Sequence, residues 1–472
     1  MFFTNCHSIF LSRLNTYFCG LWRAVLVRFN LFCSTFISQM PDFATVVCQK
    51  AAIAAVLVLV ALGYWTNRNA PVFQRPFSVW WAFVLFRIVP FGLVYLVLDY
   101  DVRSDAWMFY DSARQALQLK TVYRDFDTAY SPLFPYLTAL PLLLWNSGKA
   151  IVLFLILAEG LAIWLTVRVF KDNVRTAQRA ILYLITPAPL VLSVLSGQED
   201  ILMWLFGAWA VLVWQKRQDD LWVGIILGLG MVATKALMVL TLIPVFFLVK
   251  NQLRYFLGLL LVGLPALVVM YALVGLEFLE PIQQANDPRT PNLWTILRPL
   301  FGEIIPLGHK ALNWVGLVAV LGLGCALAYR WRRKNRFVEG FTVLFVATYA
   351  LVMIVQQSSL ANYAYLFLLP MLFVPSVQVT KKTNFFLLLL LNFAIVVQPP
   401  IWWGLKMPIF KTLNDLAHPW PAAEYLLEVV IVGCLGYFLV VLVKDDDTIK
   451  LINDDAIDYW QDTLLNKTTK GK

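Results

Sequence analysis

The chain has 472 residues, of which 60% are hydrophobic and only 14% are charged, and this composition excludes an ordinary soluble globular protein. The net charge of +10 does not indicate a nucleic-acid partner, because the basic residues lie in short clusters between apolar segments, as in membrane proteins. Many apolar segments approach the roughly 20 residues that a helix needs to cross a bilayer, whereas a β-barrel would show short alternating segments. The composition predicts an all-α polytopic membrane protein.

The first 43 residues differ from the rest of the chain. Residues 17–38 are apolar but contain two arginines, so they fit an interfacial helix better than a membrane span. They lack a signal-peptide cleavage pattern. Met40 begins a sequence that is more typical of a membrane-protein start. We therefore expect residues 1–43 to be an interfacial N-terminal extension or the result of a start site assigned upstream of Met40.

Residues 44–443 form the predicted transmembrane domain, with about 12 or 13 helices, and residues 444–472 form a charged cytoplasmic tail. Segment 221–249 is too long for one span and too short for two full spans, so it predicts a hairpin with its tip near Thr234 and Lys235. Segment 181–214 predicts another, with its tip at residues 196–200. The predicted apolar segments are 44–65, 79–98, 151–170, 181–195, 201–214, 221–249, 255–274, 311–329, 341–355, 363–374, 385–397 and 425–443.

The basic clusters predict which loops face the cytoplasm, because cytoplasmic loops of membrane proteins carry an excess of lysine and arginine. The remaining loops carry the unusual polar residues, which predicts one extracytoplasmic polar cavity built from the ends of many helices. The basic clusters are Arg68 and Arg75, Lys171 with Arg175 and Arg179, Lys216 and Arg217, Lys250 and Arg254, residues 330–336, and Lys381 with Lys382. The polar elements are the loop around Asp105, residues 197–200, Lys235, and loops 277–310, 356–362 and 398–421.

The first polar loop is large and rich in carboxylates. Asp99, Asp101, Asp105, Asp111, Asp125 and Asp127 follow an apolar segment closely, and Tyr123, Tyr130, Phe134 and Tyr136 lie among or just after them. A carboxylate such as Asp105 at the rim of a partly dry cavity can act as a general base toward a hydroxyl. The aromatic rings can stack on a sugar or line a lipid groove. This loop therefore predicts chemistry on a lipid-linked substrate.

Lys235, Glu199 and Asp200 are ionisable groups between apolar segments. Such groups cost roughly 2.5 to 3.5 kcal/mol at membrane depth, so they should have partners or substrates. An anionic phosphate is a natural partner for Lys235, and a base together with a cation indicates group transfer from a phosphate leaving group.

Each of these residues also has a purely structural interpretation. Asp111 and Arg114 can form an intrahelical pair, since they are three residues apart. Glu199 or Asp200 can cap the following helix, and Lys235 can extend to the surface without a ligand. The six cysteines show no CxxC spacing, so we predict no zinc site.

The motifs in this order resemble the GT-C superfamily of polytopic glycosyltransferases, which use polyprenyl-phosphate sugars. The pattern D-x-x-x-F-x-D-x-A-R from Asp105 to Arg114, followed by the Tyr-Ser-Pro-Leu sequence at Tyr130, looks like the first extracytoplasmic loop of bacterial polyprenyl-phosphate-mannose-dependent mannosyltransferases and of the GPI mannosyltransferase I catalytic subunit. SGQEDILMWLF at residues 196–206, the lysine at 235 and QSSLANYAYLFLLPM at residues 357–371 are similar to later family elements.

This resemblance implies an inverting transfer on the outer face, with a polyprenyl-phosphate sugar as donor and a lipid or glycan as acceptor. Asp105 matches the family's catalytic aspartate. The eukaryotic relatives carry an Asp-x-Asp that ends at this residue, whereas the chain has Arg103-Ser104-Asp105. The comparison leaves a divalent metal open and assigns no metal ligand. The implied donor-phosphate contacts are Lys235 and Arg114, and the implied substrate-binding residues are Asp111, Tyr130, Gln198, Glu199, Asp200, Gln357 and Tyr363.

Two other function classes fit parts of the sequence. A transporter or flippase of lipid-linked sugars would also place charges in a membrane cavity, but the polar residues collect on one face. A non-catalytic scaffold subunit would tolerate replacement of Asp105. No N-x-S/T sequon is found apart from Asn466-Lys467-Thr468 in the predicted cytoplasmic tail, which favours a bacterial plasma membrane.

Overall fold

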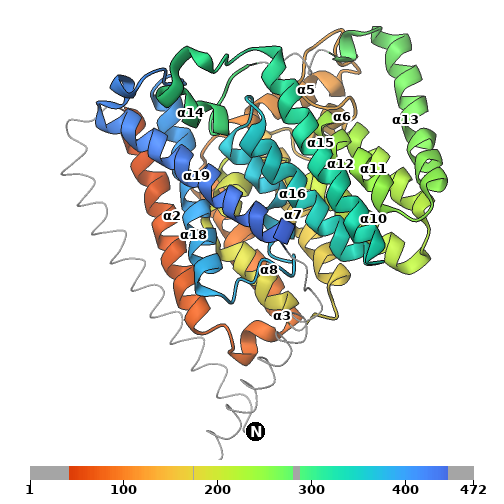
Figure 1. The fold of residues 1–472 in the computed structure, drawn as a ribbon, viewed down its shortest axis with the longest axis horizontal. Helices are drawn as coiled ribbons and strands as arrows, with labels where there is room; N and C mark the ends of the chain where they lie inside the picture. The colour runs from red at the N-terminus through yellow and green to blue at the C-terminus, as the bar shows by residue number, and fades with distance from the viewer. Residues whose placement is uncertain (1–41, 174, 280–286, 445–472) are drawn as a thin grey trace, which may run out of the picture.

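A computed structural model describes residues 42–444 except 174 and 280–286. Residues 1–41 of the predicted extension and 445–472 of the predicted tail, including the Asn466 sequon, lie outside the described residues. The described chain forms a bundle of helices, with long helices side by side and short helices gathered at one end (Figure 1).

The helices of the first half begin with the span α2 and end with α10. Their bounds are α2 Asp42–Thr66, η1 Pro71–Gln74, α3 Pro76–Phe83, η2 Val84–Ile88, α4 Val89–Phe91, η3 Gly92–Val97, α5 Asp105–Leu117, α6 Phe134–Ala139, η4 Leu140–Leu143, α7 Gly148–Val169, α8 Thr176–Ile185, α9 Pro187–Leu190, η5 Val191–Leu195 and α10 Ile201–Arg217.

The helices of the second half run from α11 to α19. Their bounds are α11 Asp220–Ala233, η6 Ala236–Met238, α12 Val239–Leu248, α13 Gln252–Val274, α14 Leu293–Phe301, η8 Gly302–Ile304, α15 Lys310–Arg333, α16 Phe337–Val355, η9 Ala361–Ala364, α17 Tyr365–Met371, α18 Lys382–Gly404, η10 Leu413–Leu416 and α19 Pro419–Lys444.

Eight helical segments of the described chain are long and apolar enough to cross a membrane, which confirms an all-α multi-pass membrane protein. A ninth forms if α8 and the helix Pro187–Leu195 are one span bent by 63°. The bend follows Thr186, because a residue before proline disfavours helical geometry. The eight are Phe43–Asn67, Pro76–Val97, Gly148–Val169, Gln252–Val274, Lys310–Arg333, Phe337–Val355, Lys382–Gly404 and Pro419–Lys444.

The other predicted spans are shorter helices. Predicted span 363–374 becomes α17, which has seven residues, all of them buried.

Both predicted hairpins are present. The Asn251 backbone N–H donates to Asp220 Oδ2 at 2.7 Å, so segment 221–249 returns to its starting end. Gln215 Nε2 donates to the Val169 carbonyl at 3.0 Å, so the chain after tip 196–200 returns to the end where α7 finishes.

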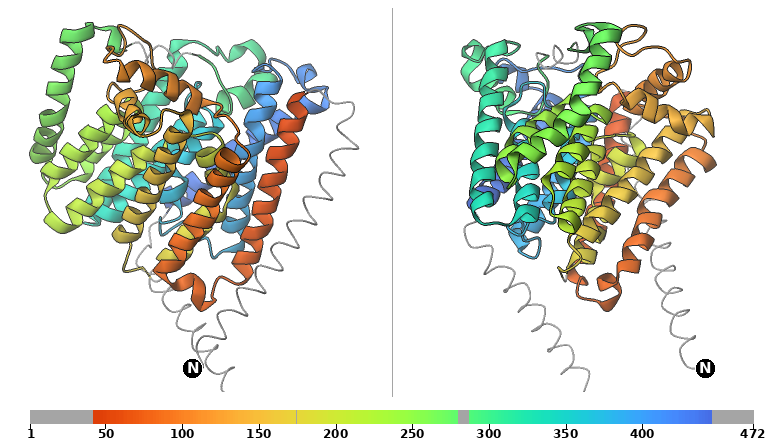
Figure 2. Two further views of the ribbon diagram at one scale, coloured as in Figure 1. Left: turned by 180° about the vertical axis from the view of Figure 1, so that it is seen from behind. Right: turned by 90° about the vertical axis from the view of Figure 1, so that its right-hand side faces the viewer.

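The two ends of the bundle differ in the way that the basic clusters predict. At one end, which we call the Arg68 end, Gln178 Nε2 donates to the Arg68 carbonyl, and Arg332 Nη2 donates to the Lys250 carbonyl. The other end, which we call the Asp105 end, carries α5, α6 and α14. Figure 1 shows these helices at the top and the start of α3 at the bottom, and Figure 2 shows the same order from two other sides.

Helices α11 and α13 approach closely through two glycines. A Cβ at Gly224 would lie 2.2 Å from the Tyr255 carbonyl oxygen, and one at Gly258 would lie 2.2 Å from the Leu221 carbonyl oxygen. Small residues allow such backbone approach between helices in a membrane, where van der Waals packing drives association. The contact attaches the outer helix α13 to the Lys235 hairpin.

A buried ion pair joins the helices beneath the Asp105 end. Arg87 Nε donates to Glu159 Oε2 at 2.7 Å and Arg87 Nη2 donates to Glu159 Oε1 at 2.9 Å, and neither side chain is exposed. The Tyr183 and Ser193 hydroxyls also donate to this carboxylate, at 2.9 and 2.7 Å. The network therefore links the span Pro76–Val97, α7 and the hairpin that carries tip 196–200.

Removing one partner of this pair leaves an uncompensated buried charge. We expect Glu159→Ala to lower the free energy of unfolding by about 3 to 5 kcal/mol, measured by denaturation in detergent. The double variant Arg87→Leu/Glu159→Leu should lose less. As a control, Arg254→Gln breaks a half-exposed pair with Asp219 and should cost about 1 kcal/mol or less. Equal losses for Glu159→Ala and Arg254→Gln would contradict the expectation.

Candidate active site

Asp105 is the first residue of α5, and the helix places it at the edge of the bundle. Ala106, Phe109, Ala113 and Ala116 are buried on one face of α5, so the helix packs on its neighbours through small residues and one ring. The Asp105 carboxylate is half-buried.

Tip 196–200 brings the second hairpin against Asp105. Gln198 Nε2 donates to Asp105 Oδ2 at 2.6 Å, and Asn362 Nδ2 donates to Gln198 Oε1 at 2.7 Å. The approach requires Gly197, which has φ +60°, and whose Cβ, if present, would lie 2.7 Å from Ala106 Cβ. One amide therefore orients the Asp105 carboxylate and ties three distant segments together.

Lys235 lies between the two acidic residues of the tip. Its Nζ is 2.7 Å from Asp200 Oδ1 and 2.5 Å from Glu199 Oε1, and its side chain is 15% exposed. Lys235 therefore does not extend to the surface. Asp200 precedes α10 but makes no capping hydrogen bond with its side chain. The ion pair, rather than capping, accounts for the acidic residues of the tip.

Two carboxyl oxygens of this cluster have neither a hydrogen-bond nor an ion-pair partner in the described part of the chain: Glu199 Oε2 and Asp200 Oδ2. A buried polar atom without a partner is uncommon in native structures. Such oxygens are suited to accept hydrogen bonds from a bound ligand that carries hydroxyl groups.

Burial raises the pKa of Glu199 to about 8, although Lys235 acts in the opposite direction. Burial would lower the pKa of Lys235, but the adjacent Asp200 and Glu199 outweigh it and hold that pKa well above its ordinary value. At neutral pH, Lys235 is therefore charged while Glu199 is largely protonated. Burial also raises the pKa of Asp200, although Lys235 acts in the opposite direction.

Aromatic rings flank the ammonium group. Lys235 Nζ lies 5.2 Å from the ring centroid of Tyr130 and 5.1 Å from that of Tyr363, within the range of a cation–π interaction. The Tyr130 ring stacks on Phe134 at 4.6 Å. The Ser131 backbone N–H donates to the Thr234 carbonyl at 3.1 Å, which fixes the Tyr130 segment beside the Lys235 hairpin.

The structure brings several of the predicted site residues together in one cluster, as the prediction of a single polar cavity requires. They are Asp105, Tyr130, Gln198, Glu199, Asp200, Lys235 and Tyr363. Arg114 and Asp111 lie on the exposed side of α5 outside it. Arg114 lies over the Tyr110 ring, and Asp111 accepts from Gln115, so the pair considered between them is not formed. Gln357 is fully buried, and its side chain bonds to the Gly308 N–H and the His309 carbonyl, so it holds a loop.

Two residues of this region were not identified from the sequence. Asn362 completes the Gln198 network, and its place in the polar turn 356–362 was the available signal. Arg289 is half-buried and makes no ion pair within the described residues. Its backbone N–H donates to the Gln357 carbonyl at 2.7 Å. Burial raises the pKa of Tyr363, whereas Lys235 and Arg289 lower it, so the Arg289 charge lies near the cluster.

No group of three or more His, Cys, Asp or Glu side chains in the described ranges is arranged to hold a metal ion. The carboxylates beside Asp105 pair with Lys235 instead. The residues present therefore do not form a ready set of metal ligands.

Residues 129–355 match the family model of glycosyltransferase family 87. The matched segment includes Tyr130, tip 196–200, Lys235 and Arg289, whereas Asp105 lies before it. The similarity supports a membrane glycosyltransferase, which is an enzyme of the transferase class. A search of the curated proteins finds no match to the chain.

A side chain at position 197 should disturb the site without touching its charged groups. We expect Gly197→Ala to push α5 away from the tip and to lower sugar transfer by about a hundredfold, since a displacement of about 1 Å can have this effect. Turnover in detergent measures it. The matched control is Gly302→Ala, because Gly302 has φ +61° but nothing near its Cβ position. Similar activity in the two variants would exclude the close approach as the cause.

Proposed function

We propose that the chain transfers a sugar, with mannose as the first candidate, from a polyprenyl-phosphate donor to a hydroxyl of a lipid-linked or glycan acceptor. The reaction takes place on the extracytoplasmic face of a bacterial plasma membrane. The observation that carries the proposal is the Asp105 carboxylate, held by Gln198 beside a buried cluster with unpartnered carboxylate oxygens. The similarity to a glycosyltransferase family favours transfer over transport of lipid-linked sugars.

In the proposed reaction Asp105 is the general base. Its Oδ1, which receives only a long hydrogen bond of 3.5 Å from the Ser104 hydroxyl, accepts the proton of the acceptor hydroxyl as the hydroxyl oxygen attacks the anomeric carbon of the donor. The bond from this carbon to the phosphate oxygen breaks, and polyprenyl phosphate leaves with the bonding electrons. A single displacement of this kind inverts the anomeric configuration. General-base catalysis contributes typically a hundred- to ten-thousand-fold.

The buried cluster is the proposed binding site for sugar hydroxyls. Glu199 and Asp200 oxygens without partners accept hydrogen bonds from the sugar, and Lys235 keeps these carboxyl groups in position. The Tyr130 and Tyr363 rings offer apolar walls on which a sugar face can stack. Buried groups that are paired only when a hydroxyl ligand is bound also reject ligands that lack the hydroxyl.

The donor phosphate requires a cation whose charge is not already balanced. Lys235 contacts two acidic side chains, so it offers less to a phosphate than its isolated charge indicates. Arg289 has no ion pair in the described residues and lies near Tyr363. We therefore assign the phosphate to Arg289 together with Lys235. Arg114, on the exposed side of α5, is assigned to the entry of the donor headgroup.

The base function of Asp105 has a direct test. We expect Asp105→Asn to lower kcat by at least a hundredfold while donor binding persists, because the amide keeps the shape but cannot take a proton. Transfer from a panel of polyprenyl-phosphate sugars in nanodiscs measures this. Asp127→Asn, which changes an exposed carboxylate of the same loop, is the control. Equal turnover of the Asp105 variant and wild type would remove Asp105 from the chemistry.

The pKa of Glu199 predicts how donor binding depends on pH. Above pH 8 the ionised Glu199 adds a negative charge that repels the donor phosphate, so KM for an anionic donor should rise. For two charges about 10 Å apart, the expected rise is about tenfold. Glu199→Gln should abolish this rise. Arg289→Ala should instead raise KM at every pH. An unchanged rise in Glu199→Gln would show that another group titrates, and an unchanged KM in Arg289→Ala would remove Arg289 from the phosphate site.

A further inference from the structure

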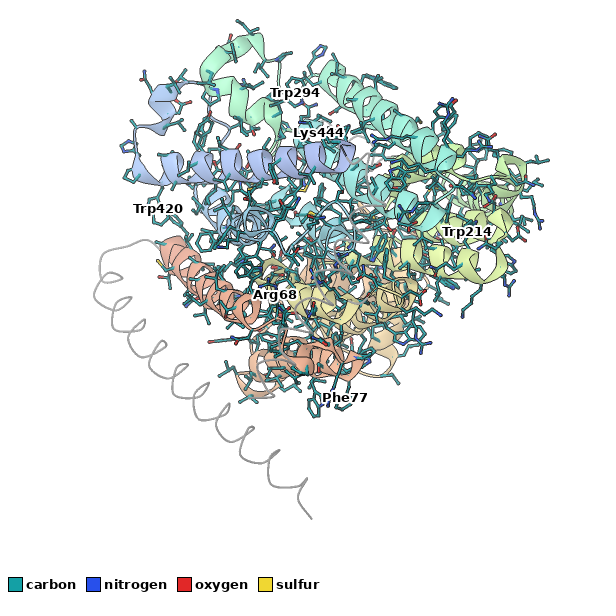
Figure 3. The ribbon with its side chains drawn as sticks, turned by 60° about the horizontal axis from the view of Figure 1, so that its bottom comes forward. Arg68, Phe77, Trp214, Trp294, Trp420 and Lys444 are labelled. Atoms are coloured by element: carbon teal, nitrogen blue, oxygen red, sulfur yellow. The ribbon has the colours of Figure 1, made fainter. Side chains whose placement is uncertain are left out.

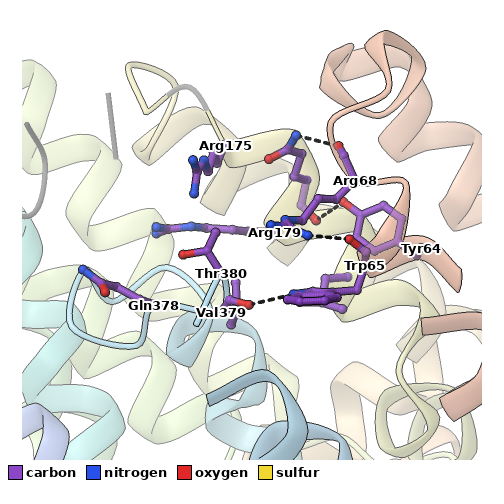
Figure 4. Close-up of a pocket in the computed structure, with 10 residues that line it drawn as sticks. Tyr64, Trp65, Arg68, Arg175, Arg179, Gln378, Val379 and Thr380 are labelled. Carbon is purple, nitrogen blue, oxygen red and sulfur yellow. Dashed lines mark hydrogen bonds between the residues drawn. The ribbon is translucent and has the colours of Figure 1, made fainter. Parts of the chain in front are cut away.

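A pocket at the Arg68 end gathers three arginines, but these side chains already interact within the protein. The pocket lies between the end of α2, the start of α8 and the loop before α18 (Figure 4), and Figure 3, which brings this end forward, places Arg68 inward from the edge where Phe77 lies. Arg68, Arg175 and Arg179 each have interactions with other groups of the chain. Arg68 Nη1 also donates to the Trp65 carbonyl at 2.7 Å. This pocket therefore gives no indication of a ligand.

At the Asp105 end, the amide of Asn362 uses only one of its two polar atoms. Its Nδ2 donates to Gln198 Oε1 at 2.7 Å. Its Oδ1 is buried and has no hydrogen-bond partner among the described residues. Buried side-chain oxygens of native structures nearly always have a partner. The Asn362 oxygen is therefore suited to a ligand that donates a hydrogen bond.

The charge of Asp105 determines which atom of the Asn362 amide is left without a partner. A carboxylate only accepts hydrogen bonds, so Gln198 presents its amino group to Asp105 and its oxygen to Asn362. Asn362 must then present its own amino group to Gln198. The remaining atom is the oxygen, which is an acceptor at every pH because an amide does not titrate. Glu199 differs, because burial raises its pKa to about 8.

Asn362 lies within reach of the sugar in the proposed reaction. It precedes Tyr363, whose ring centroid is 5.1 Å from Lys235 Nζ. Two hydrogen bonds and one amide group separate Asn362 from Asp105, a separation comparable to the width of a sugar ring. The acceptor hydroxyl that Asp105 deprotonates attacks the anomeric carbon, so this carbon lies beside Asp105. Hydroxyls elsewhere on the transferred sugar can then reach Asn362.

A ligand can approach the site from the side where its residues are partly exposed. Asp105, Asn362 and Tyr363 each keep part of the side chain exposed, whereas Gln198 is buried. The Asn362 oxygen itself is covered by its neighbours. Changes of side-chain rotamer are common on binding, and such a change uncovers the oxygen.

We propose that Asn362 determines sugar specificity: its Oδ1 accepts a hydrogen bond from one hydroxyl of the transferred sugar, while its Nδ2 holds Gln198. This role rests on the proposed sugar transfer and adds a residue that lies after the segment matching family 87. A sugar that lacks this hydroxyl leaves the oxygen buried without a partner, and a site built for a hydroxyl rejects such an analogue. The substrate class is therefore a sugar in which this hydroxyl is present and unmodified.

The test compares polyprenyl-phosphate mannose with its monodeoxy analogues, each of which lacks one hydroxyl, as donors in nanodiscs. If the wild type transfers another sugar faster, that sugar and its analogues are used. For the wild type, kcat/KM should fall about tenfold to a hundredfold for the analogue that lacks the contacted hydroxyl. Asn362→Ala should lower kcat/KM for the complete sugar but cause no further loss for that analogue, because the contact is already absent.

A second variant separates binding of the sugar from support of Gln198. Asn362→Asp keeps an acceptor oxygen but cannot donate to Gln198. It should transfer more slowly than the wild type and still discriminate against the same analogue. Loss of discrimination in Asn362→Asp as well as in Asn362→Ala would show that Asn362 acts only through Gln198, which would overturn the sugar contact.

The matched control is Asn384→Ala, which removes a buried amide at the Arg68 end. Asn384 Nδ2 donates to the Gln378 carbonyl at 3.1 Å and its Oδ1 accepts from the Tyr437 hydroxyl at 2.7 Å, so both atoms are satisfied. This variant should change kcat/KM for all donors by one common factor. A common factor in Asn362→Ala would overturn the role of Asn362 and leave the transfer reaction in place. Absence of transfer by the wild type would instead contradict the proposed function, and the role of Asn362 with it.

Discussion

A buried lysine between two carboxyl groups organises the Asp105 end of this protein. Lys235 lies at the tip of one hairpin and Glu199 and Asp200 at the tip of another, and each hairpin carries charge that the membrane does not tolerate alone. Joining the tips pairs the charge of each hairpin with an opposite charge. The same contact sets Gln198 beside Asp105 and Tyr130 beside the ammonium, so the electrostatic requirement of one side chain determines the position of the others.

The cluster contains more acidic than basic groups, and this imbalance shapes what it can bind. Glu199 relieves part of it by holding a proton at neutral pH, because burial raises its pKa. A protonated carboxyl group both donates and accepts hydrogen bonds, as sugar hydroxyl groups do. It therefore suits an uncharged sugar better than a charged ligand. An anionic phosphate is favoured only toward the side where Arg289 lies. The candidate site is therefore polarised, with a neutral part, which we propose binds the sugar, and a cationic edge.

Sequence reasoning was most successful where a rule of membrane energetics applied. The hairpin tips near Lys235 and at 196–200 were identifiable because the segments were too long for one span and carried charges at their centres. The partner of Lys235 was not identifiable, since either a phosphate or a carboxylate can balance the charge of a lysine. In the structure its partners are Glu199 and Asp200. Arg87 and Glu159 carried the same signal, charges inside apolar segments, but their pairing across two helices needs the fold. Span 363–374 was predicted from composition, which cannot distinguish a buried helix from one that faces lipid.

The Asp105–Gln198–Asn362 chain of hydrogen bonds also has a consequence for biogenesis. Its two links join residues 93 and 164 positions apart. Contacts of such long sequence separation form late, because closing the long intervening loop has an entropic cost. A nascent chain can insert its first spans and even pair Lys235 with the acidic tip, but Asp105 gains its full set of neighbours only when the turn after α16 arrives. Assembly of the candidate active site is thus coupled to near-completion of membrane insertion.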